Sequence, residues 1–269
     1  MDGPMSNRTT NERFPQILQG KTALITGAGG GVGRGIALAM AEVGANVVIA
    51  ARRGSTGEET AGLIRAEGGQ ALAIETDVTR LDDVRRAVDG AAKQFGRLDI
   101  LVHNATHGAS GHPKRLEDFA DDDWDEQLAV DLAGAHHCAL AAFDALRANG
   151  CGRVMLLCSA FGLHGASLNP AYAAIKGGIR GLTKALAREW GLSGITVNAI
   201  SPSALTPATD AFFALNPPLR DRYIANFPMG RMGREREDIG RAVAALCGDG
   251  LGYVTGQIIQ VDGGLYTAV

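Results

Sequence analysis

Three polar side chains have the types and the spacing to form one ligand site. Tyr172 and Lys176 stand four residues apart in a run of good helix formers, so one helix face would carry both. Ser159 closely follows the apolar run 154–157, which is typical of a buried parallel strand. Open α/β sheets bind ligands at the carboxyl ends of their strands. These residues therefore predict a site at that edge, provided that the rest of the chain supplies a cofactor.

The elements that would position this site alternate regularly along the chain. Strands are expected at 22–26, 46–50, 70–75, 98–102, 152–158, 194–200 and 257–261, and helices near 34–43, 56–67, 80–95, 122–148, 171–191 and 236–247. Strands separated by helical patterns indicate βαβ units joined by right-handed crossovers. We therefore predict an α/β fold with a doubly wound sheet of seven strands, mostly or fully parallel, and helices on both faces.

The domain organisation follows from length and composition. The 269 residues could form one large domain, and no linker-like change in composition divides them. Residues 1–19 are polar and are predicted to form a flexible tail, so that residues 20–269 form a single domain.

Charge and composition exclude several classes of function. A net charge of −3 gives no basic field for nucleic acid or an anionic membrane. No apolar run approaches the length of a membrane span, and the N-terminus has no apolar signal core. The four cysteines lack C-x-x-C spacing and the six histidines lack metal-ligand spacing. We therefore expect a cytoplasmic protein with free thiols and no metal.

A glycine-rich loop follows the first strand, at residues 27–33. Glycines allow a tight turn from strand to helix and let backbone N–H groups approach a pyrophosphate at the helix N-terminus. A glycine turn without a ligand is the alternative. The residues expected to touch the cofactor here are Gly27, Gly29, Gly31, Val32 and Gly33.

The end of the second strand would meet the adenosine ribose of such a cofactor. A carboxylate usually binds the ribose 2′-hydroxyl of NAD at this place. This chain instead reads Ala51-Arg52-Arg53, so Arg52 could pair with a 2′-phosphate, with Ser55 or Thr56 adding hydrogen bonds. Solvated surface arginines are the alternative. The pattern favours NADP over NAD, with NAD still an option.

Together these residues resemble the short-chain dehydrogenase/reductase family from about Lys21 to the C-terminus. The resemblance rests on the glycine loop, on Tyr172-x-x-x-Lys176 and on Ser159 thirteen residues before Tyr172. It also rests on Asp77-Val78-Thr79, on residues 195–198 and on residues 261–264. The family implies a Rossmann-like fold, NADP(H) or NAD(H) as cofactor, and hydride transfer between the cofactor and a carbonyl or an alcohol.

The resemblance gives each residue of the opening site a role. Tyr172 would be the general acid in reduction and the general base in oxidation, although its ordinary pKa of about 10 is high for a base. The Lys176 ammonium would favour the phenolate and hold the nicotinamide ribose. Ser159 would donate a hydrogen bond to the substrate oxygen.

The resemblance also implies further cofactor contacts, and it shows departures from the family pattern. Expected contacts are Asp77 and Val78 at the adenine, Asn104 and Ala105 after the fourth strand, and Leu205 and Thr206 near the nicotinamide. The family usually reads N-N-A-G where this chain has His103-Asn104-Ala105-Thr106. A hydrogen-bonded structural role for His103 is favoured over a second proton carrier, and Thr106 places a larger side chain near the cofactor.

Asp131 replaces the asparagine that completes the family's catalytic tetrad. That position is thought to act largely through its main-chain carbonyl, in which case aspartate substitutes at little cost. If the carboxylate instead faces Lys176, it would stabilise the ammonium and partly cancel its pull on the Tyr172 proton. Both roles stay open from sequence.

An irregular, proline-rich stretch at 202–229 is interpreted as a lid over the substrate, as in the family. With it, a mainly apolar substrate pocket would be lined by Phe161, His164, Leu168, Phe212 and Phe213. We therefore expect an oxidoreductase for a medium-sized, mainly apolar carbonyl or secondary alcohol. The alternatives are a reductase of 3-oxoacyl thioesters on acyl carrier protein or coenzyme A, and a non-catalytic NADP-binding protein. Family members imply a homotetramer, with a dimer as the alternative.

Overall fold

The computed structural model of the chain describes residues 15–215 and 217–267, except for the side chains of Ala208 and Phe212. Its centre is a seven-stranded sheet in the order β3-β2-β1-β4-β5-β6-β7. The strands are β1 (Thr22–Thr26), β2 (Asn46–Ala51), β3 (Gln70–Glu75), β4 (Ile100–His103), β5 (Arg153–Leu157), β6 (Thr196–Pro202) and β7 (Ile258–Val261). Every pairing is parallel, and the order reverses between β1 and β4. The predicted Rossmann-like fold is confirmed.

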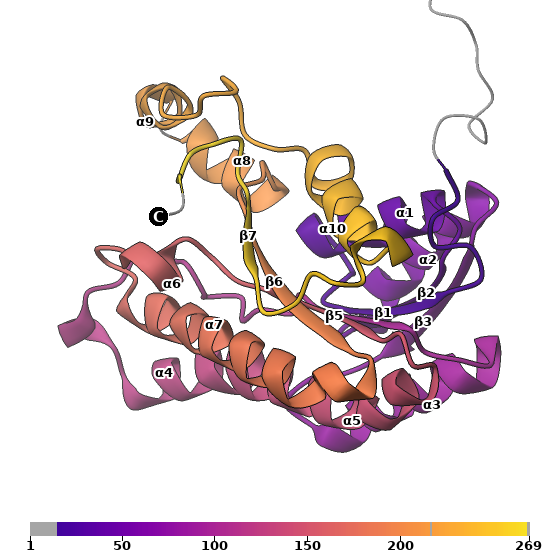
Figure 1. Cartoon of the computed structure of the whole chain (residues 1–269). Helices are drawn as coiled ribbons and strands as arrows, with labels where there is room; N and C mark the ends of the chain where they lie inside the picture. Colours follow the sequence, from indigo (N-terminus) through magenta and orange to yellow (C-terminus); the bar gives the residue numbers. More distant parts are fainter. Residues whose placement is uncertain (1–14, 216, 268–269) are drawn as a thin grey trace, which may run out of the picture.

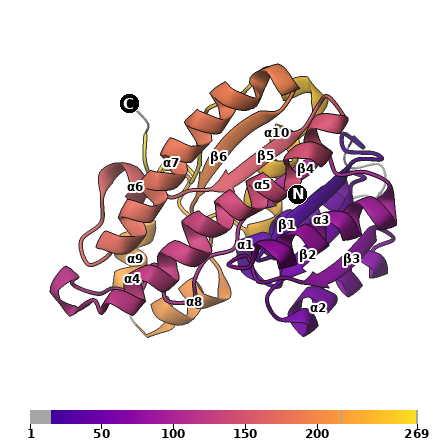
Figure 2. The same cartoon turned by 90° about the horizontal axis from the view of Figure 1, so that it is seen from below.

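Helices cover both faces of the sheet (Figure 1). One face carries α1 (Gly31–Glu42), α2 (Gly54–Ala66) and α10 (Arg241–Leu246). The other face carries α3 (Leu81–Phe95), α5 (Gly134–Ala148) and α7 (Pro170–Trp190), which lie side by side in Figure 2. The shorter elements are η2 (Leu116–Asp118), α4 (Asp121–Leu128), η3 (Ala129–Ala133), α6 (Phe161–His164), η4 (Gly191–Ser193), α8 (Pro207–Ala214), α9 (Pro217–Ile224), η5 (Glu235–Gly240) and η6 (Asp249–Leu251).

The central strands are apolar throughout because both of their faces are buried. In β1, Ala23 and Ile25 pack into the core beneath α1 and α10, while Leu24 between them packs into the core beneath α3 and α5. The same alternation recurs in β2 and β4. The sheet is therefore packed between two apolar cores. This packing holds the carboxyl ends of its strands in fixed relative positions.

The helix that carries Tyr172 and Lys176 begins and packs as its sequence dictates. Pro170 occupies the first turn of α7, where its missing N–H costs nothing. Ile175 and Ile179 are buried one turn apart and seat the helix on the sheet. Gly162 lets α6 approach closely, because a Cβ there would lie 2.5 Å from the Lys176 carbonyl carbon.

Three segments differ from the sequence-based expectation. The helix expected over 122–148 contains a π-helical turn, η3, between α4 and α5. The stretch 202–229, expected to be irregular, contains α8 and α9, each with proline in its first turn. The tail was expected to extend to residue 19, yet Leu18 is fully buried in the core. Residues 1–14 of that tail lie outside the described residues.

Within the described residues, no helix has the length and apolar character needed to cross a bilayer.

Candidate active site

A cavity of about 840 Å³ lies at the carboxyl ends of the strands, where the strand order reverses. This is the place where doubly wound sheets bind their ligands. Many of the residues predicted to contact a cofactor line it: Gly27, Gly29, Gly31, Val32, Gly33, Arg52, Asp77, Val78, Asn104, Ala105, Tyr172, Lys176 and Thr206. The fold thus gathers side chains from almost the whole length of the chain into one cavity.

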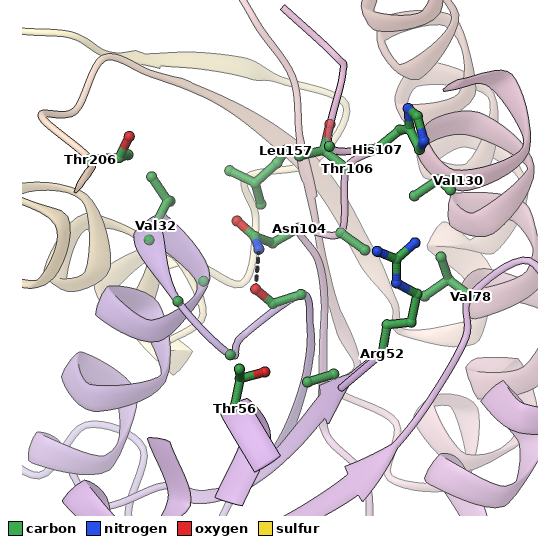
Figure 3. Close-up of a pocket in the computed structure, with 18 of the residues that line it drawn as sticks. Val32, Arg52, Thr56, Val78, Asn104, Thr106, His107, Val130, Leu157 and Thr206 are labelled. Carbon is green, nitrogen blue, oxygen red and sulfur yellow. Dashed lines mark hydrogen bonds between the residues drawn. The ribbon is translucent and has the colours of Figure 1, made fainter. Parts of the chain in front are cut away.

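The glycine loop forms the floor of the cavity and is tied to the end of β4. The Asn104 amide nitrogen donates to the carbonyls of Thr26 and Gly27, each at 3.1 Å (Figure 3). Gly33 lies directly against this contact, because a Cβ there would sit 2.4 Å from the Asn104 amide and 2.6 Å from the Gly27 carbonyl oxygen. The first turn of α1 therefore opens onto the cavity with its N–H groups, which fits a bound pyrophosphate.

Arg52 and Asp77 line the far end of the cavity. Arg52 is exposed after β2 and extends toward Val78, on the opposite side of the cavity from Val32 and Thr206 (Figure 3). Among the described residues that line the cavity, Asp77 is the only carboxylate. Its Oδ1 already accepts from the backbone and the hydroxyl of Thr79, at 2.9 Å and 2.7 Å. The residues present therefore fit a dinucleotide cofactor.

Tyr172 and Lys176 lie together at the other end. Lys176 is 4% exposed, and its Nζ is 5.4 Å from the centre of the Tyr172 ring. The ammonium donates to the Leu157 carbonyl at 3.0 Å and lies 3.1 Å from Oδ1 of Asp131. A buried cation is thus held beside the phenol by one carbonyl and one carboxylate.

Ser159 begins the turn that leads from β5 to α6. Its hydroxyl oxygen accepts from the Phe161 N–H at 3.2 Å, which leaves the hydroxyl proton free to donate. Ser159 does not line the described cavity, although its neighbour Cys158 does. The Phe161 ring meets the Tyr172 ring edge-on, with centroids 6.2 Å apart. Ser159 is therefore hydrogen-bonded to the backbone of the residue whose ring contacts Tyr172.

A hydrogen-bond chain joins η3 to the ends of β1 and β4. His103 Nε2 donates to the main-chain carbonyl of Asp131 at 3.2 Å, a carbonyl that the π-helical turn presents sideways. The Thr26 hydroxyl accepts the N–H groups of Asn104 and Ala105 and donates to His103 Nδ1 at 3.2 Å. These partners require a neutral imidazole, and burial lowers the His103 pKa to about 4.

The neutral state of His103 should make the free energy of unfolding depend on pH. The unfolded chain binds a proton at His103 below pH 6.5 and the folded chain does not, so stability is lost as pH falls from 6.5 toward 4. Between pH 7 and pH 5 the loss due to His103 is expected to be about 2 kcal/mol. Denaturant unfolding of wild type and His103→Asn at both pH values measures it. A His136→Asn variant, altered at an exposed position, should keep the wild-type dependence.

Several residues predicted for the site lie elsewhere. Leu205 bonds through its backbone to Gly233, and its side chain packs on the small core of α8 and α9. Phe213 is 5% exposed within that same core and is not a wall of the cavity. His164 stacks on Tyr266 with centroids 5.1 Å apart, and Leu168 is 46% exposed. The Phe212 side chain lies outside the described residues. A pocket built from Phe161, His164 and Leu168 stays a prediction.

Sequence reasoning missed three partners of the buried carboxylate and one partner of the lysine. Thr106 was noted for its size, yet its hydroxyl donates to Asp131. His107 and Ser110 also bind that carboxylate. Their position just after β4 was the available signal. The Leu157 carbonyl that holds Lys176 left no signal, because every residue has a carbonyl.

Comparisons with known proteins agree with this geometry. A family model described as enoyl-(acyl carrier protein) reductase matches residues 27–266. The chain is 36% identical to 3-oxoacyl-(acyl-carrier-protein) reductase FabG of Staphylococcus aureus, over 91% of this chain and 98% of that protein. It is 34% identical to 2-dehydro-3-deoxy-D-gluconate 5-dehydrogenase of Bacillus subtilis, over 92% and 95%. A crystal structure of a candidate short-chain alcohol dehydrogenase from Sinorhizobium meliloti superposes with a TM-score of 0.87 at 36% identity, covering 93% of this chain and 98% of that one.

Proposed function

The chain belongs to the short-chain dehydrogenase/reductase family, and from that premise we propose that it transfers a hydride between NADP(H) and a medium-sized, mainly apolar carbonyl or secondary alcohol. Family membership makes it a nicotinamide-dependent oxidoreductase acting on CH–OH or C=O groups. One observation carries the proposal. Tyr172 and the buried Lys176 line the same cavity as the glycine loop and Arg52.

In the proposed reaction, some residues of the cavity bind the cofactor and others take part in proton transfer. The bound nicotinamide supplies the hydride in reduction and accepts it in oxidation. Tyr172 gives its Oη proton to the substrate oxygen in reduction and takes a proton from the alcohol in oxidation. Lys176, beside the ring, would favour the ionised phenol and hold the ribose hydroxyls of the bound cofactor, and Ser159 would direct its free hydroxyl proton to the substrate oxygen.

Arg52 supports NADP as the preferred cofactor. It lines the cavity and is exposed, in a place where a carboxylate would be needed for the 2′-hydroxyl of NAD. An Arg52→Ala variant is expected to raise KM for NADPH about tenfold to a hundredfold, since a charged hydrogen bond is lost, while KM for NADH changes little. Initial rates with both cofactors measure the effect.

A matched control for that variant is Arg85→Ala. Arg85 is an exposed arginine on α3 that pairs with Asp82 at 3.1 Å, away from the cavity lining. Its removal should leave both KM values unchanged. A wild-type enzyme that prefers NAD, together with an Arg52→Asp variant that behaves like wild type, would refute the role of Arg52.

A second function is favoured by the relatives. The FabG relatives are 3-oxoacyl-(acyl-carrier-protein) reductases, so reduction of a 3-oxoacyl thioester is the alternative for this chain. A panel of simple ketones, secondary alcohols and acyl thioesters, followed by NADPH absorbance, separates the two. Preference for thioesters by a large factor in kcat/KM would replace the apolar ketone as the substrate class.

The remaining proposals concern the whole protein. Strands from both ends of the described chain share one sheet, which supports a single domain over residues 20–269. The free cysteines Cys138, Cys151, Cys158 and Cys247 suit a reducing, cytoplasmic setting. We propose a homotetramer, with a dimer as the alternative. Sedimentation analysis of the purified protein distinguishes them.

A further inference from the structure

Both oxygens of the Asp131 carboxylate face hydrogen-bond donors in a fully buried position. Oδ1 lies 3.1 Å from the Lys176 ammonium and accepts from the Thr106 hydroxyl at 2.6 Å. Oδ2 accepts from the His107 N–H at 2.8 Å and from the Ser110 hydroxyl at 3.3 Å. The ammonium and the backbone N–H cannot accept a hydrogen bond. A carboxylate accepts from both of these donors through its two oxygens. An asparagine has one oxygen, so its amide N–H groups would face either the ammonium or the backbone N–H.

Asp131 also provides the charge that balances Lys176. The titratable groups around this ammonium are Tyr172 on α7, Asp131 on η3, His103 on β4 and Cys158 after β5. Burial lowers the His103 pKa to about 4 and raises the pKa of the Cys158 thiol, so both are uncharged at neutral pH. Among the described residues, Asp131 therefore supplies the negative charge that faces Lys176 while the phenol is protonated.

The pKa of Lys176 agrees with that pairing. Burial alone lowers the pKa of the ammonium, but its interactions with Tyr172 and Asp131, including the hydrogen bond to Asp131, outweigh burial and raise the pKa above its ordinary value. Lys176 is thus a stable cation whose field is shared between the phenol and the carboxylate.

The same carboxylate fixes the loop that follows β4. Thr106, His107 and Gly108 line the cavity. The His107 ring also lies 3.5 Å from Glu126 on α4. Residues 106–110 are therefore tied through one buried carboxylate to the lysine that faces the phenol.

We propose that Asp131 and Thr106 are positioning residues: the carboxylate anchors residues 106–110 beside the reaction centre and, as the counter-ion of Lys176, weakens the pull of that ammonium on the Tyr172 proton. The inference rests on the proposed function in one respect, the proton-transfer role of Tyr172. Its consequence is that the phenol stays protonated to a higher pH, which is the form needed to reduce a carbonyl.

An Asp131→Asn variant should move the ionisation of Tyr172 about one pH unit lower, because a buried opposing charge is removed from Lys176. Turnover at the pH optimum should stay within about tenfold of wild type. Two measurements follow the shift. One is the pH profile of kcat/KM for alcohol oxidation. The other is the ultraviolet titration of phenol ionisation, taken as the difference between each protein and its Tyr172→Phe derivative.

The optical titration needs no turnover, so it separates this inference from the proposed function. If the protein has no activity, yet Tyr172 ionises about one pH unit lower in Asp131→Asn than in wild type, the proposed function is refuted and the counter-ion role of Asp131 is supported. If the protein is active, yet the midpoint of Tyr172 ionisation is the same in wild type and Asp131→Asn, the counter-ion role of Asp131 is overturned and the proposed function stands. Should Asp131→Asn not fold, the double variant Thr106→Gly/Asp131→Asn, which restores the residues usual in the family, carries the same titration.

Thr106→Val is the matched control for the anchoring role. It removes the hydroxyl bond and leaves the carboxylate charge in place. KM for NADP should rise severalfold, because residues 106–108 of this loop line the cavity, while the midpoint of Tyr172 ionisation should stay at its wild-type position. A purely structural role predicts instead that both variants lower the melting temperature alike, with neither the midpoint nor KM moving. That result would overturn the proposal.

Discussion

Replacing Tyr172 by phenylalanine is expected to lower turnover about a thousandfold, because loss of a positioned general acid or base typically costs between about a hundredfold and ten-thousandfold. The phenol lines the same cavity as the Lys176 ammonium, and phenylalanine keeps the ring that meets Phe161 edge-on. The packing of α6 on α7 should therefore survive. Steady-state rates with the best substrate of the panel measure the effect, and fluorescence titration measures NADPH binding, which should persist.

Tyr253→Phe is the control for this experiment, since Tyr253 is fully exposed, at 102% of its reference area, and lies outside the cavity lining. It should turn over at the wild-type rate. If Tyr172→Phe also kept the wild-type rate across the substrate panel, the catalytic proposal would fall. A non-catalytic NADP-binding protein would then be the better description.

Replacing Gly33 by alanine should disable the cofactor site and weaken the fold together. The added Cβ would lie 2.6 Å from the Gly27 carbonyl oxygen and 2.4 Å from the Asn104 amide, and the first of these is backbone that cannot rotate away. Overpacking of this kind costs about 1 to 3 kcal/mol. We expect NADPH affinity to fall at least about a hundredfold, because the turn that presents the α1 N–H groups must move. Isothermal titration and thermal unfolding measure the two effects.

Gly62→Ala tests whether these effects belong to the site. Gly62 lies within α2, and a Cβ there meets nothing within 4 Å. Alanine should leave NADPH affinity unchanged and raise stability by about 0.5 to 1 kcal/mol, because glycine in a helix interior is costly. Wild-type affinity in Gly33→Ala would mean that the pyrophosphate does not rest on this turn.

Periodicity and chain order were sufficient to predict the sheet. The apolar runs at residues 22–26 and 46–50 predicted strands within a residue of β1 and β2, because strands buried on both faces carry no polar interruption. The pairing of Tyr172 with Lys176 followed from helical spacing alone, and α7 places both at the cavity. Local sequence was therefore sufficient for these strands and for the helix face shared by Tyr172 and Lys176, but not for α8 and α9.

Sequence could not supply the relations that depend on tertiary distance. Whether the Asp131 carboxylate faces Lys176 or the position acts only through its main-chain carbonyl could not be read from spacing, because Asp131 lies in a π-helical turn that no periodicity marks. The surroundings of Phe213 were hidden for a related reason, since the sequence does not show that this side chain packs into the small core of α8 and α9. An apolar residue in a predicted loop indicates that its side chain is buried, but it does not indicate which residues the side chain packs against.

The Thr26 hydroxyl makes the largest number of hydrogen bonds that its chemistry allows. A hydroxyl has one proton and two lone pairs, and here the proton meets His103 while the lone pairs meet the N–H groups of Asn104 and Ala105. Thr26 is the last residue of β1, which pairs with β4 at the point where the strand order of the sheet reverses. The half proposed to bind the nucleotide and the half proposed to transfer the proton are thus joined at one hydroxyl whose hydrogen-bonding capacity is filled, so a displacement of either half would break at least one of these bonds.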